Sequence, residues 1–206
     1  MILAIDTSVG ISVAVHDGTE VVSEISSSAH GLQGELTAQY LQSALQAAAC
    51  SVESITSVVV GVGPGPFTGL RVGITTALTF AHALEIPVHG LCSLDAIGFT
   101  RSQESIVVTD ARRKELYWAK YQNGLRVSEP AVNTPREILD LNPNAEFIGT
   151  AVSLYPEVIS GPHVELQAGN LANLFARGLA QTLPITPMYL RKPDAVPPSE
   201  QKQVNS

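Results

Sequence analysis

Short apolar runs separated by turn residues dominate the first hundred positions of the chain. Three of these runs, over residues 2–6, 10–15 and 20–26, follow one another closely. Asp17-Gly18 lies between the last two runs and is a hairpin signal, because this dipeptide tolerates the positive φ of a tight turn. We therefore expect the chain to open with three antiparallel strands.

Helical periodicity follows these strands. Apolar residues recur with the spacing of a helix face over about residues 32–49 and 68–84, which predicts two amphipathic helices. Short apolar runs on either side of the second helix predict strands at 58–61 and 87–90. A third helix is expected over 93–100, with the Ser93 hydroxyl as its N-terminal cap.

The second half repeats this order of elements. An apolar run at 105–109 ends in Asp110, residues 115–121 alternate as a strand, and Asn123-Gly124 signals another hairpin. Further along, a threonine cap and a first-turn proline predict a short helix, and an apolar run ends at a glycine. These features are Thr134, Pro135 and the stretch Phe147-Ile148-Gly149.

A last helix is expected over residues 169–183. Its inward face is expected to carry Leu171, Leu174, Phe175, Leu179 and Leu183. Each half thus begins with a strand, a turn that contains an aspartate and a hairpin, which is a weak internal duplication. We expect a two-lobed α/β protein with lobes at 1–100 and 101–192, the first carrying partner-facing helices, and a mobile tail at 193–206.

Composition narrows the class of protein. The chain has 206 residues with 45% apolar residues, enough for a substantial core, and a formal net charge of −7. An acidic surface argues against binding nucleic acid by this chain alone. Cys50 and Cys92 form no CxxC pair and are expected to be reduced. Without a signal peptide or a membrane-spanning run, the expected location is the cytoplasm.

The stretch from Gly61 to Gly73 is the most informative one in the chain. It places a glycine- and proline-rich turn between a strand and a helix start, but it is neither a P-loop nor a dinucleotide fingerprint. Two interpretations stay open: a structural turn that starts the helix, or a loop that binds a ligand or a partner. The motif residues are Gly63, Pro64, Gly65, Phe67, Thr68, Gly69 and Arg71.

Four pieces of the chain together resemble one family, the bacterial TsaB (YeaZ) subunit of the tRNA threonylcarbamoyladenosine machinery. The pieces are Ile5-Asp6-Thr7-Ser8, the stretch 63–73, Asp110-Ala111-Arg112 with Tyr117-Trp118, and Tyr189-Leu190-Arg191. The resemblance extends to about Asp194. It implies the actin/Hsp70/sugar-kinase-like (ASKHA) fold in two lobes, and a shortened, non-catalytic relative of the TsaD enzyme.

The resemblance also implies partners. With TsaB and the ATPase TsaE, TsaD transfers a threonylcarbamoyl group to the adenosine beside the anticodon of tRNAs that read codons starting with A. We expect this chain to bind a TsaD-like subunit, to work with a TsaE-like ATPase, to form a homodimer when alone, and to meet tRNA only through the complex. The alternatives are an ATP-dependent transferase or glycoprotease-like metallopeptidase, and a self-associating dimer without a fixed partner.

The sequence offers weak support for chemistry in this chain. The catalytic relatives carry two metal-binding histidines at helical spacing, whereas here His30 precedes the first helix without a second histidine three or four positions away, so no metal site is expected. Asp6, Thr7, Ser8 and Asp110 form a candidate vestigial nucleotide site, or merely end strands and bond to backbone amides. No cofactor is expected for this chain, and any ATP binding is expected only within the assembled complex.

Two helices have unusually neutral outer faces, which favours a partner surface as much as packing within the fold. On the second helix, glycine and alanine recur every four residues, at Gly69, Gly73, Ala77 and Ala81, and would admit another backbone. The charged turn from Arg112 to Glu115 is either a solvated loop or a contact for tRNA or a partner. The candidate partner-binding residues are Leu36, Tyr40, Leu41, Leu45, Arg71, Thr75, Thr79 and His82.

Overall fold

The computed structural model describes residues 1–28 and 31–191. His30 and the predicted mobile tail at 193–206 lie outside these residues. Along the described ranges, no helix combines the length and the apolar character that crossing a bilayer would require.

The first sheet is built around the first strand. Within the described residues it has five strands in the order β3-β2-β1-β4-β5. β1 (Ile2–Asp6), β2 (Ile11–His16) and β3 (Val21–Ser27) are antiparallel neighbours, whereas β4 (Ser57–Gly61) and β5 (Val88–Leu91) run parallel to β1. The predicted group of three antiparallel strands is confirmed.

The second sheet repeats the centre of the first. β6 (Ser105–Asp110) pairs antiparallel with β7 (Leu116–Gln122) and parallel with β10 (Glu146–Ile148), and β7 also pairs with β8 (Leu125–Arg126) and β9 (Ala131–Asn133). The order β7-β6-β10 matches β2-β1-β4 in both sequence and direction. The internal duplication predicted from the sequence is therefore confirmed.

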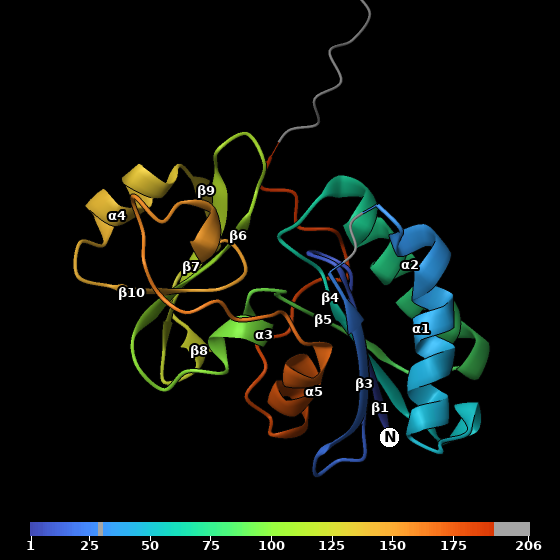
Figure 1. The fold of residues 1–206 in the computed structure, drawn as a ribbon. Coiled ribbons are helices and arrows are strands. Elements are labelled where there is room, and N and C mark those ends of the chain that lie inside the picture. The colour runs from blue at the N-terminus through green and yellow to red at the C-terminus, as the bar shows by residue number, and fades with distance from the viewer. Residues whose placement is uncertain (29–30, 192–206) are drawn as a thin grey trace, which may run out of the picture.

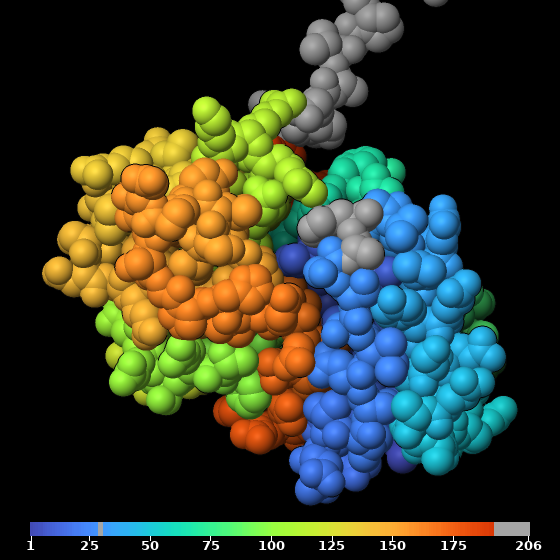
Figure 2. All heavy atoms as spheres, viewed as in Figure 1, coloured from blue at the N-terminus to red at the C-terminus, as the bar shows by residue number. Residues whose placement is uncertain are grey.

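Helices cover both faces of the first sheet, as Figure 1 shows. The helices are α1 (Gln33–Ala47), α2 (Phe67–Leu84), α3 (Asp95–Gly98), α4 (Pro135–Leu141) and α5 (Ala168–Ala176), with short 3₁₀ turns η1 (Val52–Ser54) and η2 (Val152–Leu154). α1 and α2 lie on the outer face of the sheet, and α5 lies on its inner face, between the two sheets (Figure 1). The two halves lie side by side in Figure 2.

Successive side chains along the strands of the first sheet point to opposite faces and belong to different core clusters. Leu3, Ile5 and Val13 pack with the apolar residues of α1 and α2, whereas Ala4 and Ala14 face a second cluster that includes the inward residues of α5. A third cluster lies between the second sheet and α4. α5 follows the second sheet in sequence but packs on the first one, so it ties the halves together.

The last helix is shorter than predicted. α5 ends at Ala176, because Gly178 adopts φ +68° and the Gly178 N–H donates to the Phe175 carbonyl at 3.0 Å, which closes the helix. As a result Leu179 is 44% exposed rather than inward. Leu183 instead pairs with Gly90, where the Leu183 N–H donates to the Gly90 carbonyl at 2.8 Å.

The predicted cap of the third helix is also wrong. α3 is preceded by Leu94 and has no side-chain cap. The Ser93 hydroxyl is turned toward the loop after β4, where it accepts a hydrogen bond from the Gly63 N–H at 3.1 Å. By contrast, the predicted Thr134 cap is confirmed, since Thr134 and Glu137 form a reciprocal capping box.

Candidate functional site

The loop that joins β4 to α2 is held tightly against the rest of the first half. Gly63 has φ +110°, and the Ser93 N–H donates to the Gly63 carbonyl at 2.7 Å. A Cβ atom at Gly65 would lie 2.8 Å from the Ser8 Cβ, so only glycine fits there. Pro66 occupies the position before α2 without a side-chain cap, and Thr68 lies exposed in the first turn of the helix. The glycines of this motif therefore serve close packing.

The small residues of α2 face their own chain. Thr7 inserts its hydroxyl into the helix: it donates to the Gly69 carbonyl at 2.7 Å and accepts from the Gly73 N–H at 3.0 Å. A Cβ at Gly73 would lie 2.3 Å from the Thr7 Oγ1. Ala77 and Ala81 are buried against the first sheet. The close approach of another backbone that this stripe predicts is therefore confirmed, since a Cβ at Gly69 would lie 2.5 Å from the Thr7 carbonyl oxygen, and the approaching backbone belongs to the same chain.

The turn after β1 is closed. Asp6 is 1% exposed, and its Oδ1 accepts hydrogen bonds from the Ser8 N–H at 2.8 Å and the Ser8 hydroxyl at 2.6 Å. Burial raises the pKa of Asp6, and the hydroxyls of Ser8 and Ser93 only partly offset this effect. The polar groups of Thr7 and Ser8 are thus engaged within the protein rather than presented to a phosphate.

Asp6 and Asp110 line different pockets. Asp6 lines a pocket of about 340 Å³ together with Ser12 and Ser26, whereas Asp110 lines a different pocket. The Asp110 carboxylate accepts from the Arg112 N–H at 2.8 Å and forms an ion pair with the Arg112 guanidinium at 3.3 Å. The residues of the candidate nucleotide site are therefore not gathered in the lining of one pocket.

The pocket beside Asp110 is where the motif pieces of the sequence meet. It has a volume of about 200 Å³, and we call it the motif pocket. Its lining comes from the start of α2, the end of β6, β7 and the last described segment. The lining residues are Gly65, Pro66, Phe67, Asp110, Ala111, Arg112, Arg113, Tyr117, Tyr189 and Arg191.

An aromatic and cationic cluster forms one wall of the motif pocket. The rings of Phe67 and Tyr189 stack with centroids 4.9 Å apart. The Arg71 guanidinium lies 3.7 Å from the Phe67 centroid, and its Nε–H donates to the Tyr189 hydroxyl at 3.0 Å. Phe67 is 43% exposed and Tyr189 is 37% exposed. Arg, Tyr and Phe exposed together are typical of binding surfaces.

The opposite wall is a strained turn. Arg112, Arg113 and Lys114 have φ values of 63°, 53° and 63°, in the left-handed region that side chains other than glycine rarely adopt. Such a conformation costs roughly 1–2 kcal/mol per residue. All three side chains are exposed. The sequence identified the turn as charged but gave no sign of its conformation, because no glycine marks it.

Tyr117, Tyr189 and Arg191 were missed as site residues. They stood in the motif pieces of the sequence, so the resemblance carried the signal, but the spacing along the chain did not place them near Phe67. Burial raises the pKa of Tyr117, and the nearby Arg191 opposes this shift. The second half therefore contributes a partly buried hydroxyl and several cations to the pocket.

The candidate partner residues on α1 and α2 divide into two groups. Leu45 is 6% exposed, and Leu36, Tyr40 and Leu41 are half-buried against the core. Assigning Leu45 to a partner surface is wrong, because the wide apolar stripe of α1 contacts the sheet and α2 together. On α2, four candidates are exposed: Arg71, Thr75, Thr79 and His82.

Leu78 joins this exposed group. Leu78 lies on α2 with its side chain 43% exposed, although leucine is an apolar residue. It lies next to Thr79 and one helical turn from Thr75 and His82. We call Thr75, Leu78, Thr79 and His82 the α2 ridge. The ridge contains no fixed charge and one exposed leucine.

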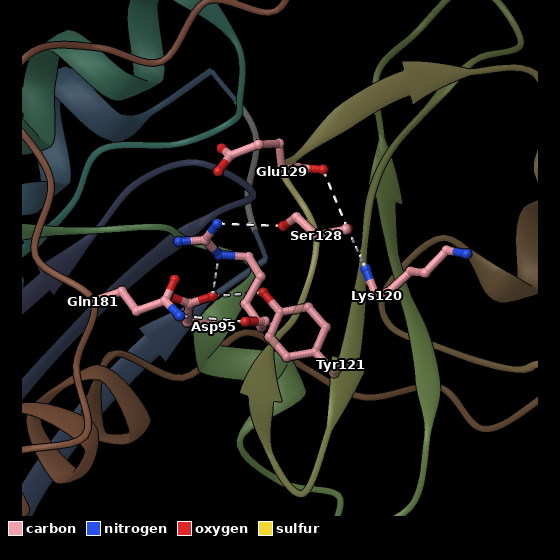
Figure 3. Close-up of polar contacts among 7 residues, drawn as sticks. Asp95, Lys120, Tyr121, Ser128, Glu129 and Gln181 are labelled. Atoms are coloured by element: carbon pink, nitrogen blue, oxygen red, sulfur yellow. Dashed lines mark hydrogen bonds and ion pairs between the residues drawn. The ribbon is translucent and has the colours of Figure 1, made fainter.

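Figure 3 shows a buried polar cluster between α3 and the β7–β8 hairpin, where the two halves meet. The Asp95 Oδ1 accepts from the Tyr121 hydroxyl at 2.6 Å and from the Arg126 Nε–H at 3.0 Å, and the Asp95 and Arg126 side chains are 7% and 4% exposed. Burial raises the pKa of Tyr121. The cluster holds α3 against the β7–β8 hairpin, which is a structural role that the sequence did not predict.

Within residues 1–28 and 31–191, no group of three or more His, Cys, Asp or Glu side chains is placed to hold a metal ion. Two of the histidines have structural partners instead. His16 is buried and contacts the Asn173 Oδ1 at 3.3 Å, and the His89 ring packs on the Phe175 ring at 4.4 Å.

A comparison with protein families identifies the family of this chain. The model described as TsaD, tRNA N6-adenosine threonylcarbamoyltransferase, matches residues 12–189. This chain belongs to the TsaD/YeaZ family. A Mycobacterium tuberculosis (strain H37Rv) protein described as uncharacterized is 40% identical over 203 residues, which cover 95% of this chain and 94% of the relative.

Other members of the TsaD/YeaZ family carry functional names. The Bacillus subtilis tRNA threonylcarbamoyladenosine biosynthesis protein TsaB is 37% identical over 78 residues, which cover 35% of this chain and 34% of that protein. A Pseudomonas aeruginosa structure described as similar to peptidase YeaZ is 24% identical, with a TM-score of 0.75 over 92% of this chain and 99% of that chain. The predicted ASKHA fold of this family member is confirmed.

Proposed function

We propose that this family member is a non-catalytic subunit that supports threonylcarbamoyl transfer to the adenosine beside the anticodon of tRNAs reading A-starting codons. It acts by binding a TsaD-like catalytic subunit. The observation that carries the proposal is the α2 ridge, where an exposed leucine lies among neutral side chains. A ridge without fixed charges is removed from water at lower cost than a charged one.

The relation between the two subunits supports this choice of partner. Because the match to the TsaD family model spans α1 and α2, we expect a TsaD-like enzyme to have helices that correspond to them. Two related chains can then pack their equivalent helices about an approximate two-fold axis, as identical subunits do in symmetric dimers. The same ridge would serve a homodimer when the chain is alone.

The remaining components are assigned to the assembly. With a net charge of −7, this chain leaves most contacts with tRNA phosphates to its partners. A TsaE-like ATPase completes the complex, and this chain needs no cofactor of its own, with any ATP bound only in the assembly. The Thr7 and Ser8 hydroxyls, engaged inside the first half, support the absence of catalysis by this chain. The expected location is the cytoplasm.

A pair of substitutions tests the α2 ridge. Thr79→Arg and Leu78→Asp place a charge on the ridge, and we expect each to weaken binding to the TsaD-like subunit of the same organism by about 10-fold or more. Thr19→Arg adds the same cation in the exposed β2–β3 turn and serves as the matched control. Titration calorimetry measures the affinity, and thermal unfolding shows whether each variant is folded.

The outcomes separate the interpretations. Wild-type affinity in folded Thr79→Arg contradicts the ridge as the contact surface. Loss of self-association with unchanged binding to the TsaD-like subunit assigns the ridge to the homodimer. Failure of the wild-type chain to bind any TsaD-like subunit, or to stimulate tRNA modification in a reconstituted reaction, contradicts the proposed function itself.

A further inference from the structure

The last described residues form an extended segment that crosses from the first half to the second. We call residues 183–191 the C-terminal strap; its course is drawn in red in Figure 1. It begins beside β5, where Leu183 bonds to Gly90. Further along, the Met188 N–H donates to the Val62 carbonyl at 2.7 Å, which fixes the strap to the end of β4.

Two side chains near the end of the strap reach opposite walls of the motif pocket. Tyr189 stacks on Phe67 and accepts a hydrogen bond from Arg71, both on α2. Arg191 reaches the β6–β7 turn, where one guanidinium N–H donates to the Ala111 carbonyl at 2.7 Å. The strap therefore bridges the start of α2 and the turn of the second sheet across the pocket.

Arg191 binds the base of the strained turn at both sides. Besides the Ala111 carbonyl, it forms a charge-assisted hydrogen bond and ion pair with the Glu115 carboxylate, and the two side chains are only 25% and 33% exposed. Ala111 and Glu115 are themselves paired, since the Ala111 N–H donates to the Glu115 carbonyl at 3.0 Å. The three left-handed residues lie between these two anchored positions.

We propose that the C-terminal strap is a clamp, and that Arg191 holds the β6–β7 turn in its left-handed conformation. A strained backbone persists only where the surroundings over-determine it. Here the Asp110 contact to the Arg112 N–H acts from within the turn, and the Arg191 contacts act from outside it. With the strap docked, the turn presents Arg112 and Arg113 to the motif pocket.

Release of the strap would remove the outer contacts and let the turn relax. Tyr189 would leave Phe67 and Arg71 at the same time, because both contacts lie on one short segment. The shape of the pocket and the placement of its cations are therefore governed by the position of the strap. This inference goes beyond the proposed partner binding and can be tested on the isolated chain.

Hydrogen exchange with mass spectrometry on the full chain tests the clamp. In Arg191→Gln, we expect the amides of residues 110–116 to exchange about 10-fold faster or more, as loss of a charge-assisted contact predicts for local opening. Tyr189→Leu should give a smaller increase in the same peptide. The amides of α1 should exchange at the wild-type rate in both variants. The matched control is Arg136→Gln, which removes an exposed arginine paired with Asp140 on α4.

The exchange rates of residues 110–116 and of α1 together either support or overturn the clamp. Faster exchange confined to residues 110–116, with an unchanged control, supports the clamp. Unchanged exchange there in Arg191→Gln overturns it, and so does an equal increase in α1, because the arginine would then stabilise the whole fold rather than the turn. Since the isolated chain is measured, the result is independent of whether a TsaD-like subunit binds the α2 ridge.

Discussion

The turn after β1 and the turn after β6 occupy equivalent places in the duplicated architecture but have opposite surroundings. The first contains Asp6 and Ser8, both buried, and is sealed by α2. The second begins at the partly exposed Asp110 and continues into exposed cations at Arg112 and Lys114. Equivalent backbone positions therefore supply a closed structural joint in one half and an open, charged pocket wall in the other.

The difference has a physical cause in what packs against each turn. The α2 glycines bring the helix backbone so close to β1 that Thr7 becomes part of the helix hydrogen bonding. The second turn is bordered by the motif pocket and by the C-terminal strap, so its side chains keep access to solvent. Duplication determines where a turn lies, and packing determines whether it can take part in chemistry.

The substitution with the largest expected effect disrupts the packing of the turn after β1. A Cβ at Gly61 would lie 1.7 Å from the Asp6 Oδ2 and 2.7 Å from the Ser93 Oγ, so the buried Asp6 carboxylate would have to shift away from its hydrogen bonds to Ser8. We expect Gly61→Ala to lower the free energy of unfolding by about 3 kcal/mol, measured by chemical denaturation. Gly34→Ala on α1, where a Cβ would meet nothing within 4 Å, should be neutral or slightly stabilising. Equal effects of the two would contradict the tight packing of this turn.

The pH dependence of the free energy of unfolding tests the burial of Asp6 in the turn after β1. Because burial raises the pKa of Asp6 in the folded state, the folded protein keeps a proton that the unfolded chain has released. The free energy of unfolding should therefore fall as pH rises from the ordinary aspartate pKa through the raised one, by at most about 1.4 kcal/mol per pH unit. Asp6→Asn should remove this contribution, whereas Asp140→Asn on exposed α4 should not. An unchanged pH profile in Asp6→Asn would show that burial of the first turn has no electrostatic cost.

The smallest expected effect concerns the open turn. Lys114→Gly removes a side chain from a left-handed residue, and we expect the free energy of unfolding to rise by up to about 1 kcal/mol. Arg136→Gly places a glycine in helix α4. Because glycine has more backbone freedom to lose on folding, this substitution should lower the free energy of unfolding by roughly 0.5–1 kcal/mol. Denaturation midpoints of the two variants check the sign. A decrease for Lys114→Gly would mean that the turn is not strained.

Much of the fold was predictable because local signals agreed with it. Strand order at the start of the chain, the Asn123-Gly124 hairpin and the Thr134 cap all followed from residue types at short range. The end of α5 was not predicted correctly, since the apolar period continued past Gly178 while the backbone turned there. The sequence predicted a close approach along the small residues of α2 but left the neighbour open, because periodicity shows that a face is small but not which segment occupies it.

The sequence by itself determined the duplicated order of elements, the motif pieces and the acidic charge, because these depend on residue type and spacing alone. Only the tertiary structure decided that Phe67, Asp110 and Tyr189 meet at one pocket. Their convergence depends on how α5 and the C-terminal strap cross between the sheets, and such long-range packing has no local pattern in the chain. The same packing decided which of the two equivalent turns was buried and which stayed open.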